Sequence, residues 1–352
     1  MFDINFYRKS QVIQKKIDSG ELLTREELFD TLEKFRSEKP FVYNIETTNA
    51  CNMRCEMCPR TTMMTRPVET MDRRLFHTII DQLRPFSLPE WSKWEKFCES
   101  AYHIPAMGMG ENHFFLYIIP KVLQLHGYGD PLLDMNMPHY IKLLHEKHFF
   151  SYFSCNPSNI NLNSVQDLFE NNLDYIKYSF ESVSDSVHKK IRGRASNFSE
   201  AFKKVNRLLD IKEENGYKTT VIITMLNLNR PDQMEDYHNL EEAFRGKNVY
   251  LYLKSEDQQW YRKIFHGTTS IHWSEFCKHP WMSMTMKSNG EAAMCMEDFN
   301  NEIILGDANE ESLRDIWNGG KYRQFRWDHF HLTPGIKCSE QCDMKLIGEF
   351  CK

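Results

Sequence analysis

From Phe41 to Lys254 the sequence alternates short apolar runs, typical of buried strands, with longer amphipathic stretches, typical of helices. The expected strands are Phe41–Ile45, Val122–His126, Phe149–Ser154, Tyr175–Phe180, Thr219–Met225 and Val249–Lys254. The expected helices between them are Asp72–Leu83, Pro138–Lys147, Val165–Asn171, Phe198–Asn215 and Pro231–Phe244. This rhythm predicts an α/β fold with a parallel sheet, because parallel neighbours need a crossover connection. Periodicity alone leaves a partial barrel and a doubly wound sheet open.

Two segments lie outside this rhythm. Residues 1–40 are charged with a helical pattern, and Thr24-Arg25-Glu26-Glu27 has the capping-box spacing that begins a helix. Residues 85–112, between the first helix and the second strand, are rich in Pro, Met and aromatic side chains. We expect an extra helix pair packed on the barrel there, with a substrate lid as the alternative. Cys98 in this insertion is a weak candidate for a hydrogen-atom donor, since a single cysteine on a helix face is more often a small buried hydrophobic residue.

Cys51, Cys55 and Cys58 place three thiol groups on the loop that follows the first expected strand. Three ligands are too few to close a tetrahedral zinc site and one short of the four that complete a [4Fe–4S] cluster. A cluster held by these cysteines would keep one iron open to a small molecule. The alternative interpretation is a zinc knuckle or a chance group of cysteines.

This loop resembles the signature of the radical SAM enzymes over Glu46–Cys55 and Cys58-Pro59-Arg60. The family usually has an aromatic residue before the third cysteine, where this chain has Met57, which is also apolar and polarizable. The resemblance implies a [4Fe–4S] cluster whose open iron is chelated by S-adenosylmethionine. It also implies a partial (β/α)6 TIM-like barrel, with the cofactor lying across the carboxyl ends of the strands.

The segment after the second expected strand, His126–Leu133, resembles the glycine-rich element of the family. In that element the backbone contacts the amino group of the cofactor methionine. The resemblance implies a cofactor-binding role for Gly127, Gly129 and Asp130, which stands where glutamate is usual. Glycine lets a backbone pass close to a ligand, which agrees with this role. A plain strand-to-helix turn is the alternative.

The fourth expected strand ends in Ser179-Phe180-Glu181 and is followed by Ile191-Arg192-Gly193-Arg194, which also resembles the family. Ser179, together with Arg192 or Arg194, is implied as the contact of the methionyl carboxylate, because a guanidinium suits a carboxylate. The sequence leaves open which arginine it is. The weaker candidates for ribose or adenine contacts are Asn156 and Asn227.

The last eighty residues hold a second set of cysteines: Cys277, Cys295, Cys338, Cys342 and Cys351. Asn289-Gly290, between two short strand-like runs, is a strong hairpin signal, and Ser312–Asn318 is a short amphipathic helix. Hairpin, helix and cysteine spacing together resemble the SPASM/Twitch extension of radical SAM enzymes.

In its shorter Twitch form, the extension implies one auxiliary [4Fe–4S] cluster on Cys277, Cys295, Cys338 and Cys342. Four thiolates would saturate this cluster and suit it to electron transfer. Cys351 would be spare, and a zinc site on the same four cysteines is the alternative. The expected domains are a helical extension (1–40), a partial barrel (41–265) and a small iron–sulfur domain of hairpin plus helix (266–352).

Charge and composition exclude several partner classes. The formal net charge is −5 with no basic block, which argues against nucleic acid as a partner. No apolar run reaches membrane-spanning length, and the N-terminus lacks the apolar core of a signal peptide, so we expect a cytoplasmic protein with no membrane association. In that compartment ten cysteines favour metal binding over disulfides.

The resemblance implies a radical enzyme that cleaves S-adenosylmethionine and abstracts a hydrogen atom from its substrate. Its architecture is similar to that of aminocyclitol dehydrogenases, so we expect dehydrogenation or epimerisation of a small sugar, aminocyclitol or nucleotide. Its electron donor would be a flavodoxin or ferredoxin. One alternative is modification of a peptide, which we expect less because the forty residues before Phe41 are too short for a leader-binding domain. The other alternative is a non-catalytic iron–sulfur redox protein. The weak candidates for a general base are Glu297 and Asp298, then Lys254 and Glu256.

Overall fold

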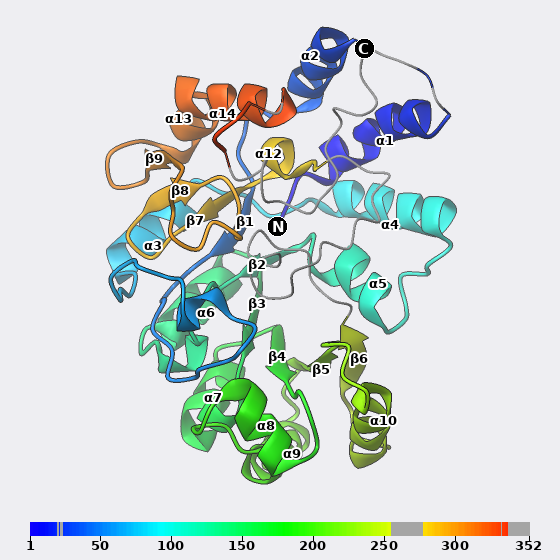
Figure 1. Ribbon diagram of the computed structural model, residues 1–352, viewed down its shortest axis with the longest axis vertical. Helices are drawn as coiled ribbons and strands as arrows, with labels where there is room; N and C mark the ends of the chain where they lie inside the picture. The colour runs from blue at the N-terminus through cyan, green and yellow to red at the C-terminus, as the bar shows by residue number, and fades with distance from the viewer. Residues whose placement is uncertain (20, 22–23, 255–276, 332, 337–352) are drawn as a thin grey trace.

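The computed structural model describes residues 1–19, 21, 24–254, 277–331 and 333–336, and within them nine strands form one sheet (Figure 1). The strand order is β6-β5-β4-β3-β2-β1-β7-β8-β9. The first six strands are β1 (Val42–Ile45), β2 (Val122–Gln124), β3 (Phe150–Cys155), β4 (Tyr175–Ser179), β5 (Thr220–Leu226) and β6 (Tyr250–Lys254). Neighbours among them pair in parallel. The predicted α/β fold with a parallel sheet is therefore confirmed.

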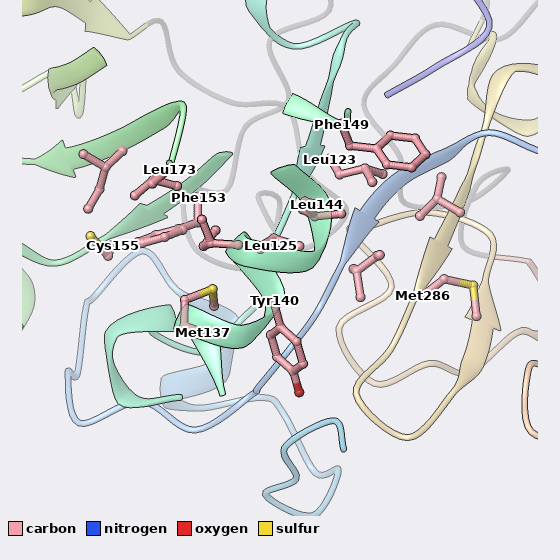
Figure 2. Close-up of a cluster of buried hydrophobic side chains, with 14 of the residues drawn as sticks. Leu123, Leu125, Met137, Tyr140, Leu144, Phe149, Phe153, Cys155, Leu173 and Met286 are labelled. Carbon is pink, nitrogen blue, oxygen red and sulfur yellow. The ribbon is translucent and has the colours of Figure 1, made fainter. Parts of the chain in front are cut away.

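One face of this sheet is covered by the crossover helices. They are α3 (Arg73–Ile80), α6 (Met137–Glu146), α7 (Leu162–Glu170), α8 (Asp185–Arg192), α9 (Phe198–Asn215) and α10 (Gln233–Ala243). The resulting core contains Leu123 of β2, Leu125 directly after β2, Phe153 of β3 and Leu144 of α6, as Figure 2 shows. Burial of these apolar side chains stabilises the layer by about 25 cal/mol per Å² removed from water.

The opposite face carries the insertion. It contains α4 (Leu88–Tyr102), α5 (Glu111–His113) and the π-helical turn η2 (Phe114–Ile118). Trp94 and Cys98 of α4 are fully buried in a cluster with Tyr152 of β3 and Tyr250 of β6. The insertion thus packs on the sheet through one long helix, α4, followed by short helical turns, where the sequence predicted a helix pair or a lid.

The N-terminal helices α1 (Ile4–Asp18) and α2 (Arg25–Phe35) precede the barrel. Thr24 and Glu27 form the expected capping box, and Leu28, Phe29 and Leu32 lie buried. Short turns η1 (Pro59–Thr61), η3 (Pro131–Leu133) and η4 (Pro157–Asn159) lie in the loops at the carboxyl ends of strands. In the part of the chain described here, no helix is long and apolar enough to cross a membrane.

The C-terminal strands extend the barrel sheet. The strands β7 (Met284–Met286), β8 (Glu291–Ala293) and β9 (Ile304–Asp307) form an antiparallel meander, and β7 pairs in parallel with β1. Gly290 turns the predicted hairpin with a φ of +95°. The helices α12 (His279–Met282), α13 (Leu313–Asn318) and α14 (Gly320–Phe330) pack beside it. The C-terminal region and the barrel therefore share one sheet, and Met286 lies in the same core as Leu123 (Figure 2).

The helix α14 was not predicted from the sequence. Its buried face includes Arg326, which is 1% exposed and donates from Nε to Glu33 of α2 at 2.7 Å. Because a charged residue lies on the buried face, the sequence of this helix lacks the regular 3.6-residue spacing of apolar residues that predicts an amphipathic helix.

Candidate active site

The three N-terminal cysteines lie together at the carboxyl end of β1. Cys51, Cys55 and Cys58 all line one cavity of about 300 Å³. The base of their loop is held by a buried ion pair between Glu46 and Arg66, with Nη2 2.7 Å from Oε1. The arrangement brings three soft ligands to one open space.

Burial governs the chemistry of these thiols. It raises the pKa of Cys51 and of Cys55, and it raises the pKa of Cys58 to about 12. A thiol with a raised pKa is a poor nucleophile at neutral pH. A bound metal centre deprotonates its thiol ligands outright, so the trio fits a metal cluster better than nucleophilic catalysis.

The two glycines after β2 line the same cavity, but their need for glycine comes from the protein. A Cβ on Gly127 would lie 2.5 Å from Oε2 of Glu46, and a Cβ on Gly129 would lie 2.1 Å from the carbonyl oxygen of Thr48. Both missing side chains make room for the base of the cysteine loop. The sequence pattern suggested that a ligand requires these glycines, whereas the atoms that would meet a side chain belong to the base of the cysteine loop.

Asp130 joins three loops around the cavity. Its backbone N–H donates to the carbonyl of Ala50 at 2.8 Å, and its carboxylate accepts from the backbone N–H of Asn156 at 3.0 Å and from Nδ2 of Asn159 at 2.7 Å. The side-chain amides of Asn159 and Asn52 of the cysteine loop in turn form two reciprocal hydrogen bonds. Asp130 and Asn156 both line the cavity, and Asp130 fixes the loops that surround it.

The structure separates the two candidate arginines. Arg192 lines the cavity, pairs with the buried carboxylate of Glu181, and places Nη1 3.8 Å from Sγ of Cys55. Arg194 is exposed and is not among the residues that line this cavity. Ser179 lines the cavity opposite the cysteines. The geometry therefore favours Arg192 over Arg194 as the carboxylate-binding arginine.

His126 and Tyr128, which sequence analysis did not single out, also line the cavity. Burial, with a smaller effect of the Lys177 cation, lowers the pKa of His126 to about 3, so its imidazole is neutral at physiological pH. The hydroxyl of Tyr128 donates to Oε2 of Glu297 at 3.3 Å. The available sequence signal was their position, with His126 at the end of the predicted strand and Tyr128 between the two glycines.

The two weak candidates that follow Cys295 have different environments. Glu297 lines the cavity, next to Tyr128. Asp298 is fully buried, and its carboxylate accepts from the backbone N–H groups of Glu302 and Ile303 at 3.0 and 3.1 Å. Asp298 thus shapes the loop that presents Glu297.

Other candidates lie elsewhere. Cys98 is buried in the apolar cluster of α4, and burial raises the pKa of its thiol to about 12. Asn227 and Lys254 are half-buried at the ends of β5 and β6, and neither is among the residues that line the cavity. Cys277 and Cys295 are half-buried before and after the hairpin. Glu256, Cys338, Cys342 and Cys351 lie outside the described residues.

Two family models match the chain. The radical SAM superfamily model matches residues 45–240, and the SPASM iron–sulfur cluster-binding domain model matches residues 277–343. The chain therefore belongs to the radical SAM superfamily and has a C-terminal SPASM domain. No curated protein sequence matches the chain.

Solved structures share the fold. Streptococcus suis SuiB bound to S-adenosylmethionine is 12% identical with a TM-score of 0.52, covering 85% of this chain and 73% of that chain. The native anSMEcpe structure with bound AdoMet is 13% identical with a TM-score of 0.50, and the match covers 85% of this chain and 88% of that chain. BtrN in complex with AdoMet and 2-DOIA is 15% identical with a TM-score of 0.48, and the match covers 86% of this chain and 93% of that chain. At such identities the likeness to SuiB and to anSMEcpe, whose TM-scores are 0.52 and 0.50, establishes the fold alone.

Membership of this superfamily implies a [4Fe–4S] cluster and S-adenosylmethionine, and the SPASM domain implies auxiliary iron–sulfur binding. The residues of the cavity fit the first pair of cofactors. Three thiols line one cavity, and Ser179, Arg192 and the glycine-rich element border it with polar groups suited to an amino acid. The protein is a radical SAM enzyme.

Proposed function

We propose that this enzyme removes a hydrogen atom from a carbinol carbon of a small polar substrate, of the sugar, aminocyclitol or nucleotide type, and oxidises it to a ketone. The observation that carries the proposal is that the segment after Cys295 enters the cavity of the first three cysteines. Met296 and Glu297 both line this cavity. A cluster ligated by Cys295 would thus have its ligand directly before Met296, the first residue of this segment that lines the cavity.

When bound, the cluster and S-adenosylmethionine would supply the 5′-deoxyadenosyl radical chemistry that removes the hydrogen atom. Completing a dehydrogenation then requires the substrate radical to lose one proton to a base and one electron to an oxidant, which would be the auxiliary cluster of the SPASM domain. Glu297, paired with the hydroxyl of Tyr128, is an oxygen acceptor at the cavity wall to which a substrate hydroxyl can donate. Arg192 and Ser179 would bind the methionyl carboxylate, and Asp130 would hold the loops in register.

For the SPASM domain we propose one auxiliary cluster, held by Cys277 and Cys295 together with Cys338 and Cys342, which lie outside the described residues. Anaerobically reconstituted protein should then contain about eight iron atoms and about eight sulfides per chain, and Cys295→Ala should lower both to about four. About twelve of each would indicate two auxiliary clusters instead.

Epimerisation is the second candidate, and Cys155 favours it. This thiol, which sequence analysis did not assign, lines the cavity at the carboxyl end of β3. Burial raises its pKa well above the usual value, so it stays a thiol and retains the hydrogen atom that a radical quench requires. Epimerisation would transfer that hydrogen atom to the opposite face of the substrate radical. The thiyl radical left on Cys155 would then take one electron from the external reductant and one proton to become a thiol again.

The test is an anaerobic reaction with dithionite, S-adenosylmethionine and a panel of polyols, amino sugars and nucleosides. Dehydrogenation predicts 5′-deoxyadenosine together with a product lighter by two hydrogens. Epimerisation predicts an isomer that carries one deuterium when the reaction is run in D2O, and Cys155→Ala should abolish it. If only a synthetic peptide is modified and no small molecule reacts, both proposals are wrong and the enzyme modifies peptides. The absence of 5′-deoxyadenosine with every substrate would also refute them.

A further inference from the structure

We propose that the exposed basic surface formed by Arg54 of the cysteine loop with Lys189, Lys190 and Arg194 at the end of α8 docks an acidic one-electron donor protein. We call these four residues the basic patch. The inference rests on the proposed function, because a cluster that must be reduced to start each reaction needs a donor. One electron would pass from the donor, which is oxidised, to the cluster, which is reduced.

The basic patch is joined directly to the loop that carries the thiols. The backbone N–H of Arg54 donates to the carbonyl of Arg192 at 3.0 Å, and that of Glu56 donates to the carbonyl of Ile191 at 2.9 Å. Gly193 has a φ of +93°, and a Cβ there would lie 3.1 Å from the Arg54 backbone nitrogen. The end of α8 therefore packs against the loop between the cysteines, and a protein bound there would lie next to the cluster.

The charge of the basic patch is available to a partner. All four side chains are exposed, and none takes part in the ion pairs found among the described residues. The neighbouring Arg192 instead turns inward to Glu181.

Two acidic residues lie near the patch. Glu56 is exposed, whereas the carboxylate of Asp185 accepts from the backbone N–H and hydroxyl of Ser199 at 2.8 and 3.0 Å. Four cations thus outnumber these two carboxylates beside the cluster loop.

This local excess of positive charge contrasts with the chain as a whole, whose formal net charge is −5. A positive surface on a negative chain orients an acidic partner, because the rest of the molecule repels it. Nucleic acid is the other polyanion that such a surface attracts. The position of the patch against the cysteine loop favours the electron donor, since electron transfer needs proximity to the cluster and nucleic-acid binding does not.

The experiment measures binding of an acidic flavodoxin to the reconstituted holoenzyme at low and at high salt. Lys189→Glu/Lys190→Glu should weaken binding on the order of tenfold at low salt and reduce its salt dependence. The matched control is Lys93→Glu/Lys96→Glu, two exposed lysines of α4, which should bind like wild type. Equal loss in both variants would show a net-charge effect and overturn the proposal.

A second readout separates docking from catalysis. With flavodoxin and its reductase as the electron source, the α8 variant should form 5′-deoxyadenosine more slowly than wild type, whereas with dithionite both should be equal. Unchanged flavodoxin binding, or selective loss of binding to a tRNA mixture, would refute the docking proposal. Failure of wild type to form 5′-deoxyadenosine with dithionite would instead refute the proposed function and leave the flavodoxin binding result intact.

Discussion

The guanidinium of Arg192, at the last residue of α8, lies with Nη1 3.8 Å from Sγ of Cys55. Its other terminal nitrogen pairs with Glu181, which is 1% exposed on its side chain. One residue thus links Cys55, a proposed cluster ligand, with the end of β4. A charged N–H near a thiolate stabilises the negative charge on sulfur.

Replacing Arg192 by leucine should destabilise the cofactor-free protein by about 3–5 kcal/mol, because it leaves the buried Glu181 without its cation. Urea unfolding measures this loss. Arg194→Leu, two residues away and exposed, should change the free energy of unfolding by less than about 0.5 kcal/mol. Equal effects of both substitutions would contradict the inward position of Arg192.

Gly129→Ala should disturb the cysteine loop, since its Cβ would lie 2.1 Å from the carbonyl oxygen of Thr48. We expect a loss of about 1–3 kcal/mol in the free energy of unfolding together with poorer iron incorporation. Gly320→Ala is the control, because a Cβ there meets no atom within 4 Å and alanine favours the helix that begins at this residue. A Gly129→Ala protein as stable as Gly320→Ala and fully loaded with iron would contradict the close contact.

Stability should fall in acid, partly because of His188. This side chain is fully buried with Nδ1 2.8 Å from the hydroxyl of Ser196, and burial, aided by the Arg192 cation, lowers its pKa from 6.5 to about 4. Between those values the unfolded chain binds a proton that the folded protein excludes. The free energy of unfolding should therefore drop as the pH falls through this window, by up to about 1.4 kcal/mol per pH unit.

His188→Gln should reduce this slope in urea titrations of cofactor-free protein between pH 6.5 and 4. The exposed His238, changed to Gln, serves as the control. A slope that is the same in His188→Gln as in wild type would show that this histidine does not contribute.

Glu297 and Asp298 should respond differently to loss of charge. Glu297→Gln should keep the fold and the formation of 5′-deoxyadenosine, while the yield of substrate product per 5′-deoxyadenosine falls at least about tenfold, because the side chain borders the cavity. Asp298→Asn should instead lower the free energy of unfolding by about 1–3 kcal/mol, because its carboxylate accepts two buried backbone N–H groups. An unchanged yield of substrate product per 5′-deoxyadenosine in Glu297→Gln would show that Glu297 takes no part in the reaction.

Local signals were enough to predict much of the fold. The strands around Val42, Phe150 and Thr220 were predicted because apolar runs bounded by helical periodicity carry their own pattern. The hairpin was predicted because Asn289-Gly290 supports the required backbone conformation, and the φ of +95° at Gly290 agrees. The buried charge of Arg326 concealed α14, because its partner Glu33 lies far away in the sequence.

By itself the sequence determined the α/β alternation, the loop of three cysteines and the place of the glycine-rich element, since each depends on residues adjacent in the chain. Only the tertiary structure decided that Arg192 rather than Arg194 faces the cavity, that Gly129 makes room for Thr48, and that β7 joins β1 in one sheet. These relationships join residues distant in sequence through packing and burial, and local periodicity carries no information about which distant partner a side chain will meet.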